Sequence, residues 1–112
     1  MKTGISKKSV RGKIAEIVRR IVETFQPEKI ILFGSHARGD AGPDSDVDLL
    51  VVMNFTGSKR EKRIEIRIAL HDIPGSFDII VTTPRDAEER RSFVGTIEYP
   101  AFREGKVVYA RG

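Results

Sequence analysis

The sequence predicts a single α/β (α+β) domain over residues 1–112, with a mixed β-sheet of about four strands and helices packed mainly on one face. Two observations predict this class. Short apolar runs suited to strands alternate with segments of helical periodicity, and Pro or Gly stands at several of their boundaries. A chain of 112 residues, 39% of them hydrophobic, is also long enough to bury the core of one domain.

The first predicted element is a helix that ends before Pro27. Its apolar residues recur at steps of one, three and four, which places them on one stripe of a helix. Ser6 and Ser9 are the two candidate caps for its start. The stripe consists of Val10, Ile14, Ile17, Val18, Ile21, Val22 and Phe25.

Four strands and three shorter helices are predicted after Pro27. The segment 63–70 has a strict alternation that would also fit a strand, but we predict a helix there. Pro100 is expected to kink or restart the last helix, and Gly105 to stop it. The predicted strands are 29–33, 46–52, 77–83 and 106–110, and the predicted helices are 63–70, 84–91 and 97–105.

The composition excludes several classes of protein. There is no cysteine, so disulfides and thiolate metal sites are absent. No signal peptide is evident and no apolar run approaches the ~18 residues that a membrane span needs, so we expect a cytoplasmic protein without a membrane partner.

The net charge is +4, and basic residues concentrate at 2–13 and 59–67. These two clusters are either solvated helix faces or surfaces that meet a polyanion or an acidic protein. Base-stacking aromatic residues do not interleave with them, so nucleic acid is not the expected partner.

Three carboxylates stand on alternate positions where an apolar run begins: Asp44, Asp46 and Asp48. Side chains two apart on a strand share a face, so Asp46 and Asp48 would repel each other by roughly 2–3 kcal/mol at an effective dielectric of 20. A divalent cation between them would offset that repulsion, and oxygen ligands suit Mg²⁺ or Mn²⁺. A turn-forming role explains Asp44. An EF-hand loop would need Gly and Glu where the chain has Leu49 and Phe55.

Two further pieces complete the candidate site. Gly34 and Ser35 follow an apolar strand, where a glycine turn and the next backbone N–H groups can hold phosphate oxygens, although in isolation a plain tight turn is the better explanation. Asp78 lies near the start of another apolar strand, as an edge residue or as part of a site. Beside the first two carboxylates it would give the third ligand of a two-metal phosphoryl-transfer site and a base for the incoming hydroxyl.

The combined pattern resembles a known superfamily. "GSHARG", then "DVDLLV" with ten residues between Ser35 and Asp46, then "FDIIV", is similar to the nucleotidyltransferases that include the DNA polymerase β palm. It is most similar to the minimal nucleotidyltransferases (MNT) of prokaryotes, which implies a polymerase β palm-like domain. The resemblance implies that Gly34 and Ser35 hold nucleotide phosphates and that Asp46, Asp48 and Asp78 are the catalytic and metal-binding carboxylates.

The "ARG" of the motif raises the question of Arg38, for which a contact to phosphate and a structural salt bridge stay open. His36 and His71 are expected to be exposed loop residues without a role in the chemistry.

The resemblance also implies a reaction and partners. A hydroxyl attacks a nucleoside triphosphate, expected to be ATP, with two Mg²⁺ or Mn²⁺ ions, and a nucleoside monophosphate is transferred. MNT proteins are paired with HEPN ribonuclease toxins, and the implied role is that of an antitoxin that moves AMP onto a toxin tyrosine. A second polypeptide or a second copy of the chain is expected to complete the site. Two alternatives stay open: transfer to a small molecule such as an aminoglycoside, and a non-catalytic module that neutralises a partner by binding.

Overall fold

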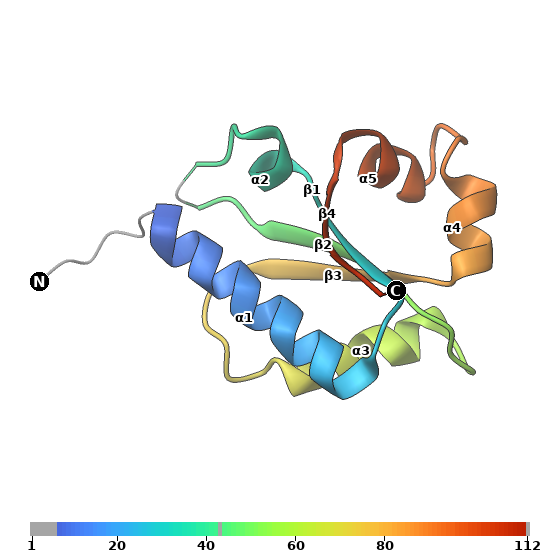
Figure 1. The fold of residues 1–112 in the computed structure, drawn as a ribbon, viewed down its shortest axis with the longest axis horizontal. Coiled ribbons are helices and arrows are strands. Elements are labelled where there is room, and N and C mark those ends of the chain that lie inside the picture. The colour runs from blue at the N-terminus through green and yellow to red at the C-terminus, as the bar shows by residue number, and fades with distance from the viewer. Residues whose placement is uncertain (1–6, 43, 112) are drawn as a thin grey trace, which may run out of the picture.

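The computed structural model describes residues 7–42 and 44–111, and the side chains from Val10 onward within them. Every predicted strand and helix is present, together with a short helix directly after the first strand (Figure 1). The elements are α1 (Lys7–Phe25), β1 (Lys29–Phe33), α2 (Ser35–Arg38), β2 (Val47–Val52), α3 (Lys59–Ala69), β3 (Phe77–Thr82), α4 (Pro84–Arg90), α5 (Glu98–Glu104) and β4 (Lys106–Ala110).

The four strands form one mixed sheet in the order β3-β2-β1-β4. β1 pairs antiparallel with both β2 and β4, whereas β2 and β3 run parallel. The register sets Phe33 opposite Asp48 and places Asp48 beside Asp78. β3 and β4 are therefore the two edge strands, and the carboxylate-bearing strands β2 and β3 are neighbours.

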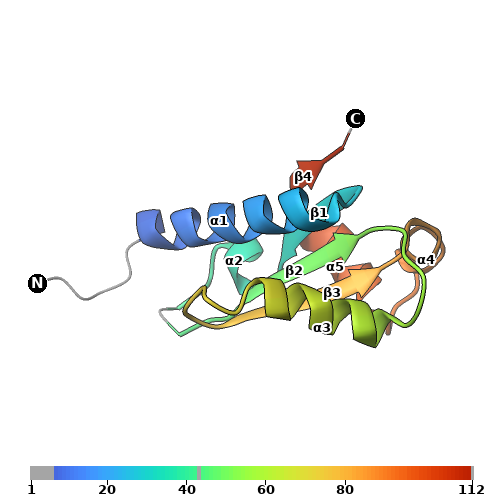
Figure 2. The same cartoon turned by 90° about the horizontal axis from the view of Figure 1, so that it is seen from below.

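Helices cover both faces of the sheet. The two longest, α1 and α3, lie against one face, and α4 and α5 lie against the other (Figures 1 and 2). The alternation of side chains in β2 supplies both cores: Val47, Leu49 and Val51 pack toward α1 and α3, and Leu50 and Val52 pack toward α4 and α5. The prediction of helices mainly on one face is confirmed, with the addition that two short helices close the other.

The ends of the helices follow local chemistry. α1 ends at Phe25, where Gln26 takes a positive φ of 51° and Pro27 follows. Ser9 lies inside α1 and is not its cap, while Ser6 lies outside the described residues. α3 begins earlier than predicted because Ser58 forms a capping box, in which its hydroxyl accepts a hydrogen bond from the Glu61 N–H.

The sequence predicts a kink or a restart of the last helix at Pro100. The structure shows no restart there. α5 begins at Glu98, so Pro100 sits in the first turn, where a missing N–H leaves no intrahelical bond unmade. Gly105 ends the helix as predicted, and its N–H donates to the Ala101 carbonyl at 2.9 Å. Across the described residues, the helices include none with the length and apolar character to cross a membrane.

Candidate active site

The predicted carboxylates gather where β2 and β3 begin. Asp48 and Asp78 are register partners in parallel strands, so their Cα atoms are about 4.8 Å apart and their side chains leave the same face. That face is the one covered by α4 and α5, because Leu50 belongs to that core. Asp46 is exposed and lies one residue before β2, which begins at Val47 rather than at 46.

The pKa of Asp48 reflects its burial and the carboxylates near it. The side chain is half-buried, and burial is the main cause that raises its pKa above the ordinary aspartate value. The negative charges of Asp78 and then Asp46 raise the pKa further, whereas His36 and Arg38 lower it by a smaller amount. Two like charges therefore act on one half-buried carboxylate, and the nearby cationic side chains do not compensate them.

Gly34 is in direct contact with this carboxylate. It takes a left-handed φ of 76°, and a Cβ at this position would overlap Oδ2 of Asp48. Any other residue would be strained in its backbone and would push Asp48 away. The proximity of the glycine turn to the Asp pair, which the sequence offers only as a motif, is thus a physical contact.

The turn leads into α2, whose first N–H groups face no capping side chain. The Gly34 carbonyl accepts from the N–H groups of Ala37 and Arg38, at 3.1 and 3.0 Å. The N–H groups of Ser35 and His36 precede these bonds in the first turn and have no intrahelical acceptor, so they and the Ser35 hydroxyl are candidate donors for an anionic ligand.

Two other residues of the motif have structural partners. Arg38 is exposed and forms ion pairs with Asp40 at 3.3 Å and Glu104 at 3.5 Å, which is the salt bridge that the sequence left open. The sequence predicts that His36 is an exposed loop residue, and this prediction is wrong. It lies in α2, is half-buried, and its Nε2 is 3.2 Å from the Ser45 carbonyl, so it ties the loop before β2 to α2.

The three carboxylates fit a hard divalent cation in donor type. Their oxygens are the ligands that Mg²⁺ and Mn²⁺ prefer, and the strand register sets Asp48 directly beside Asp78. Within residues 10–42 and 44–111, however, no three acidic or imidazole side chains already converge on one ligand position. Side-chain rotation would be needed to bring Asp46 and Asp78 onto an ion held by Asp48.

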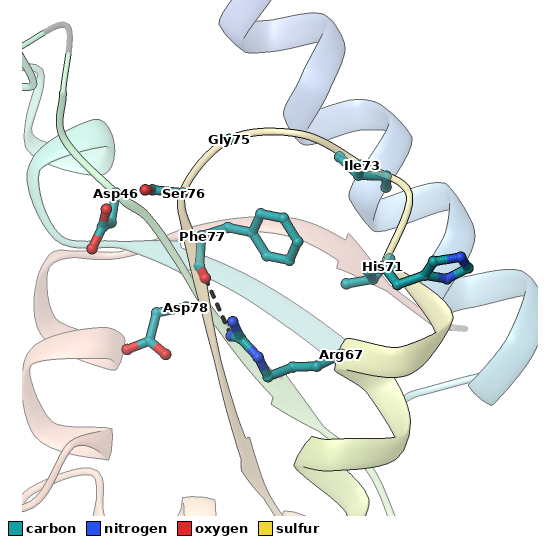
Figure 3. Close-up of a pocket in the computed structure, with 9 residues that line it drawn as sticks. Asp46, Arg67, His71, Ile73, Gly75, Ser76, Phe77 and Asp78 are labelled. Carbon is teal, nitrogen blue, oxygen red and sulfur yellow. Dashed lines mark hydrogen bonds between the residues drawn. The ribbon is translucent and has the colours of Figure 1, made fainter.

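A pocket of about 380 Å³ opens beside Asp46 and Asp78, at the free edge of β3 (Figure 3). The sequence did not predict this pocket, and it predicted no role for His71. The only signals were that Phe77 precedes Asp78 and that Arg67, in the last turn of α3, and His71, in the turn after it, stand four apart. The lining residues are Asp46, Arg67, Leu70, His71, Ile73, Gly75, Ser76, Phe77 and Asp78.

The basic segment 59–67 forms much of α3, and part of its charge is compensated. Lys59 pairs with Asp86 at 2.7 Å, and Lys62 pairs with Glu65 at 2.9 Å. Arg60 and Arg63 are exposed, so this cluster is in part a solvated helix face. The other cluster, 2–13, lies partly outside the described residues.

Comparisons with known proteins agree with this geometry. A protein of Methanocaldococcus jannaschii, named as a candidate protein adenylyltransferase, is 45% identical over 42 residues, which are 38% of this chain and 42% of that protein. The aligned segment thus spans less than half of that relative.

Solved structures share the fold. A candidate nucleotidyltransferase from Sulfolobus solfataricus superposes with a TM-score of 0.61 at 23% identity, over 98% of this chain and 94% of that one. The complex of a tri-AMPylated Shewanella oneidensis HEPN toxin with its MNT antitoxin gives a TM-score of 0.53 at 17% identity, over 90% and 72% of the two chains.

A family model settles the assignment. The model of the nucleotidyltransferase domain matches residues 12–99, a range that contains Gly34, Ser35 and all three carboxylates. The chain therefore belongs to the nucleotidyltransferase domain family.

Proposed function

We propose that this protein is a metal-dependent nucleotidyltransferase that moves AMP from ATP onto a tyrosine hydroxyl of a HEPN toxin and so acts as its antitoxin. Family membership supports the transfer chemistry. The resemblance to a candidate protein adenylyltransferase and the shared fold with an MNT antitoxin support the protein acceptor.

One observation carries the proposal. Asp48 lies beside Asp78 across the parallel strands, and Gly34 packs against the Asp48 carboxylate so closely that no Cβ fits between them. A phosphate-binding turn and two catalytic acids are thereby held in contact by the backbone, before any ligand arrives. A chain that only bound its partner would not need like charges concentrated at this place.

The chain's own residues divide the work as follows. The first N–H groups of α2 and the Ser35 hydroxyl bind and orient the triphosphate. Asp78, which is exposed at the strand edge, accepts the proton of the attacking hydroxyl. The hydroxyl oxygen forms a bond to the α-phosphorus as the bond between that phosphorus and the β-bridging oxygen breaks, and pyrophosphate leaves.

Asp46, Asp48 and Asp78 are the residues that would hold two divalent cations, which would supply positive charge to the phosphate oxygens. Asp48 is the central ligand because it touches the phosphate turn on one side and faces Asp78 on the other.

Intact-mass spectrometry tests the proposal. The purified chain is incubated with ATP, Mg²⁺ and a HEPN toxin, and the expected result is a mass gain of one or more AMP groups on the toxin and none on the chain. Replacement of the toxin's tyrosines by phenylalanine should abolish the gain, and EDTA should do the same.

Asp44→Asn is the matched control for Asp48→Asn, because Asp44 is an exposed acid in the loop that precedes β2 and lies outside the site. A toxin that remains unmodified while the same preparation labels an aminoglycoside would leave the chemistry standing and overturn the acceptor. A toxin that is inhibited equally by wild type and Asp48→Asn, without any mass change, would indicate neutralisation by binding alone.

A further inference from the structure

The pocket at the free edge of β3 adjoins the catalytic carboxylates on the side away from the phosphate turn. Across the sheet, Gly34 follows β1, Asp48 is on β2, Asp78 is on β3, and the pocket lies at the outer edge of β3. In nucleotidyl transfer the attacking oxygen and the leaving oxygen are roughly in line, on opposite sides of the phosphorus. With the leaving phosphates at Gly34, the attacking hydroxyl comes from the side of the pocket.

The pocket is lined mainly by polar atoms, with a small apolar wall. Ile73 and Phe77, both partly buried, form this wall, Leu70 is fully buried, and Asp46 and Asp78 point away from the Phe77 ring (Figure 3). A side chain with an apolar body and a hydroxyl tip matches this polarity, and tyrosine is such a side chain. A volume of about 380 Å³ is also at the low end of what small-ligand pockets need, so it suits one inserted side chain.

Two cationic side chains, Arg67 and Lys13, lie near the Phe77 ring of this wall. The Arg67 Nη1 donates to the Phe77 carbonyl at 3.3 Å, and its guanidinium lies 5.9 Å from the centroid of the Phe77 ring. Lys13 of α1 reaches the other side of this region: its Nζ is 5.8 Å from the same centroid and occupies the place of a Cβ on Gly75. His71 also lines the pocket.

These cations are not neutralised by the chain in the ranges that the structure describes. Neither Arg67 nor Lys13 forms an ion pair there, whereas Lys59 and Lys62 of the same basic surface do. The pocket therefore has at its aromatic wall a cation, Arg67, that forms no ion pair with the described residues, while the carboxylates of Asp46 and Asp78 point away from that wall. An acidic residue beside the inserted side chain would be attracted to Arg67.

We infer that this pocket is the acceptor site, and that it recognises a tyrosine flanked by acidic residues on the partner protein, with Arg67 as the residue that selects for the acidic flank. The inference rests on the proposed function, since it takes the transfer chemistry as given. A protein segment is favoured over RNA because the basic cluster 59–67 beside the pocket contains no aromatic residue, and binding to single-stranded RNA uses successive stacking aromatics.

The test measures AMP incorporation into synthetic acceptors. The acceptors are a peptide with one tyrosine between Glu and Asp residues, the same peptide with Gln and Asn instead, and an RNA oligonucleotide with a free 3′-hydroxyl. Arg67→Ala should raise the KM for the acidic peptide about tenfold or more, as expected for the loss of one hydrogen bond to a charged group, and leave the KM for ATP within about twofold. For the Gln/Asn peptide, the change in KM should largely disappear.

Arg63→Ala is the matched control, because Arg63 is exposed one helical turn earlier on α3 and does not line the pocket. It should behave like the wild type. An Arg67→Ala variant that raises the KM for ATP as much as that for the peptide would assign the pocket to the nucleotide and overturn the inference. Preference for the RNA, or equal use of both peptides by the wild type, would overturn it as well.

A binding measurement separates this inference from the proposed function. Chemical shifts of backbone amides are followed by NMR as the acidic peptide is added in the presence of Mg²⁺ and a non-hydrolysable ATP analogue. Shifts confined to 67–78 in a chain that labels no acceptor would support the pocket and overturn the transfer chemistry. An absence of shifts there, or shifts only in the apolar groove that Val18, Val22 and Tyr109 line between α1 and β4, would overturn the pocket.

Discussion

The acidic side chains near the two ends of the parallel strand pair β2–β3 differ in burial and in hydrogen bonding. At the amino ends, Asp48 lies beside Asp78 with Asp46 close by, and burial, followed by the like charges, raises the pKa of Asp48. Near the carboxyl end of β3, Thr82 is fully buried and its hydroxyl donates to the Glu98 carboxylate at 2.7 Å, where Glu98 is 2% exposed. One end therefore holds half-buried or exposed acids without compensating partners, and the other holds a buried acid with a donor.

This difference separates buried Glu98, whose hydrogen bond is compatible with stability, from the carboxylates at the amino ends, which are placed to bind ligands. A buried polar group that has its hydrogen-bond partner is compatible with a well-packed core, and loss of the partner is costly. Carboxylates that repel each other at a solvent-accessible edge destabilise the empty chain, and they are retained where a cation or substrate offsets the repulsion. Changes at the amino ends should therefore alter activity, whereas changes near Glu98 should alter stability.

The largest expected effect is that of Asp48→Asn. The isosteric amide keeps the contact with Gly34 but removes the central negative ligand, so AMP transfer should fall about 10³-fold or more, in line with a metal contribution of several kcal/mol. The rate is measured under single-turnover conditions with saturating ATP and Mg²⁺. Asp44→Asn should keep the wild-type rate, and a wild-type rate for Asp48→Asn would remove the metal-site interpretation.

Asp78→Asn should separate chemistry from binding. Loss of a general base typically costs ~10²- to 10⁴-fold, and we expect about 10² at Asp78, with the affinity for ATP retained. Calorimetric titration with an ATP analogue and Mg²⁺ gives the affinity, and the transfer assay gives the rate. A loss of affinity equal to the loss of rate would make Asp78 a binding residue instead.

Thr82→Val should lower the free energy of unfolding and leave the transfer rate unchanged. It removes the hydroxyl that donates to buried Glu98 and leaves that carboxylate unsatisfied, which costs about 1–3 kcal/mol of unfolding free energy. Urea denaturation measures the change, and the transfer rate of the folded fraction should stay at the wild-type value. The double variant with Glu98→Leu should recover part of the lost stability, because both polar partners are then removed.

The smallest expected effect is a pH-dependent change in melting temperature. The folded-state pKa of Asp48 is raised, so the stability associated with its protonated form is fully present below the ordinary aspartate pKa of about 3.8 and is lost as pH rises through the raised value. Asp48→Asn should therefore raise the melting temperature at pH 7 in EDTA, and this gain should vanish near pH 3.

Addition of Mg²⁺ should stabilise the wild type more than Asp48→Asn at neutral pH, because only the wild type keeps the central ligand. Differential scanning calorimetry across pH, with and without Mg²⁺, measures both differences. A gain in melting temperature that is the same at every pH would show that removal of the charge on Asp48 is not its cause.

The sequence by itself determined the elements and the candidates for the site. The stripe of α1 and the apolar runs of the strands are local periodicities, and a helix or a strand can be inferred from them without knowledge of its neighbours. Alternation also predicted that Asp46 and Asp48 share a face, although β2 begins only at Val47, and the Gly34–Ser35 motif predicted a turn after β1. Each of these inferences concerns residues close together in the chain.

Only the tertiary structure decided what lies beside what. The parallel register brings Asp78 next to Asp48 from thirty positions away, and the left-handed turn presses Gly34 against that carboxylate. The pocket exists because α3 and the loop after it fold back over the start of β3, so that Arg67 contacts Phe77 and His71 lines the same pocket. A periodic pattern gives the face on which a side chain lies, but strand order and register follow from how both faces of the sheet are packed at once, and no local segment encodes that.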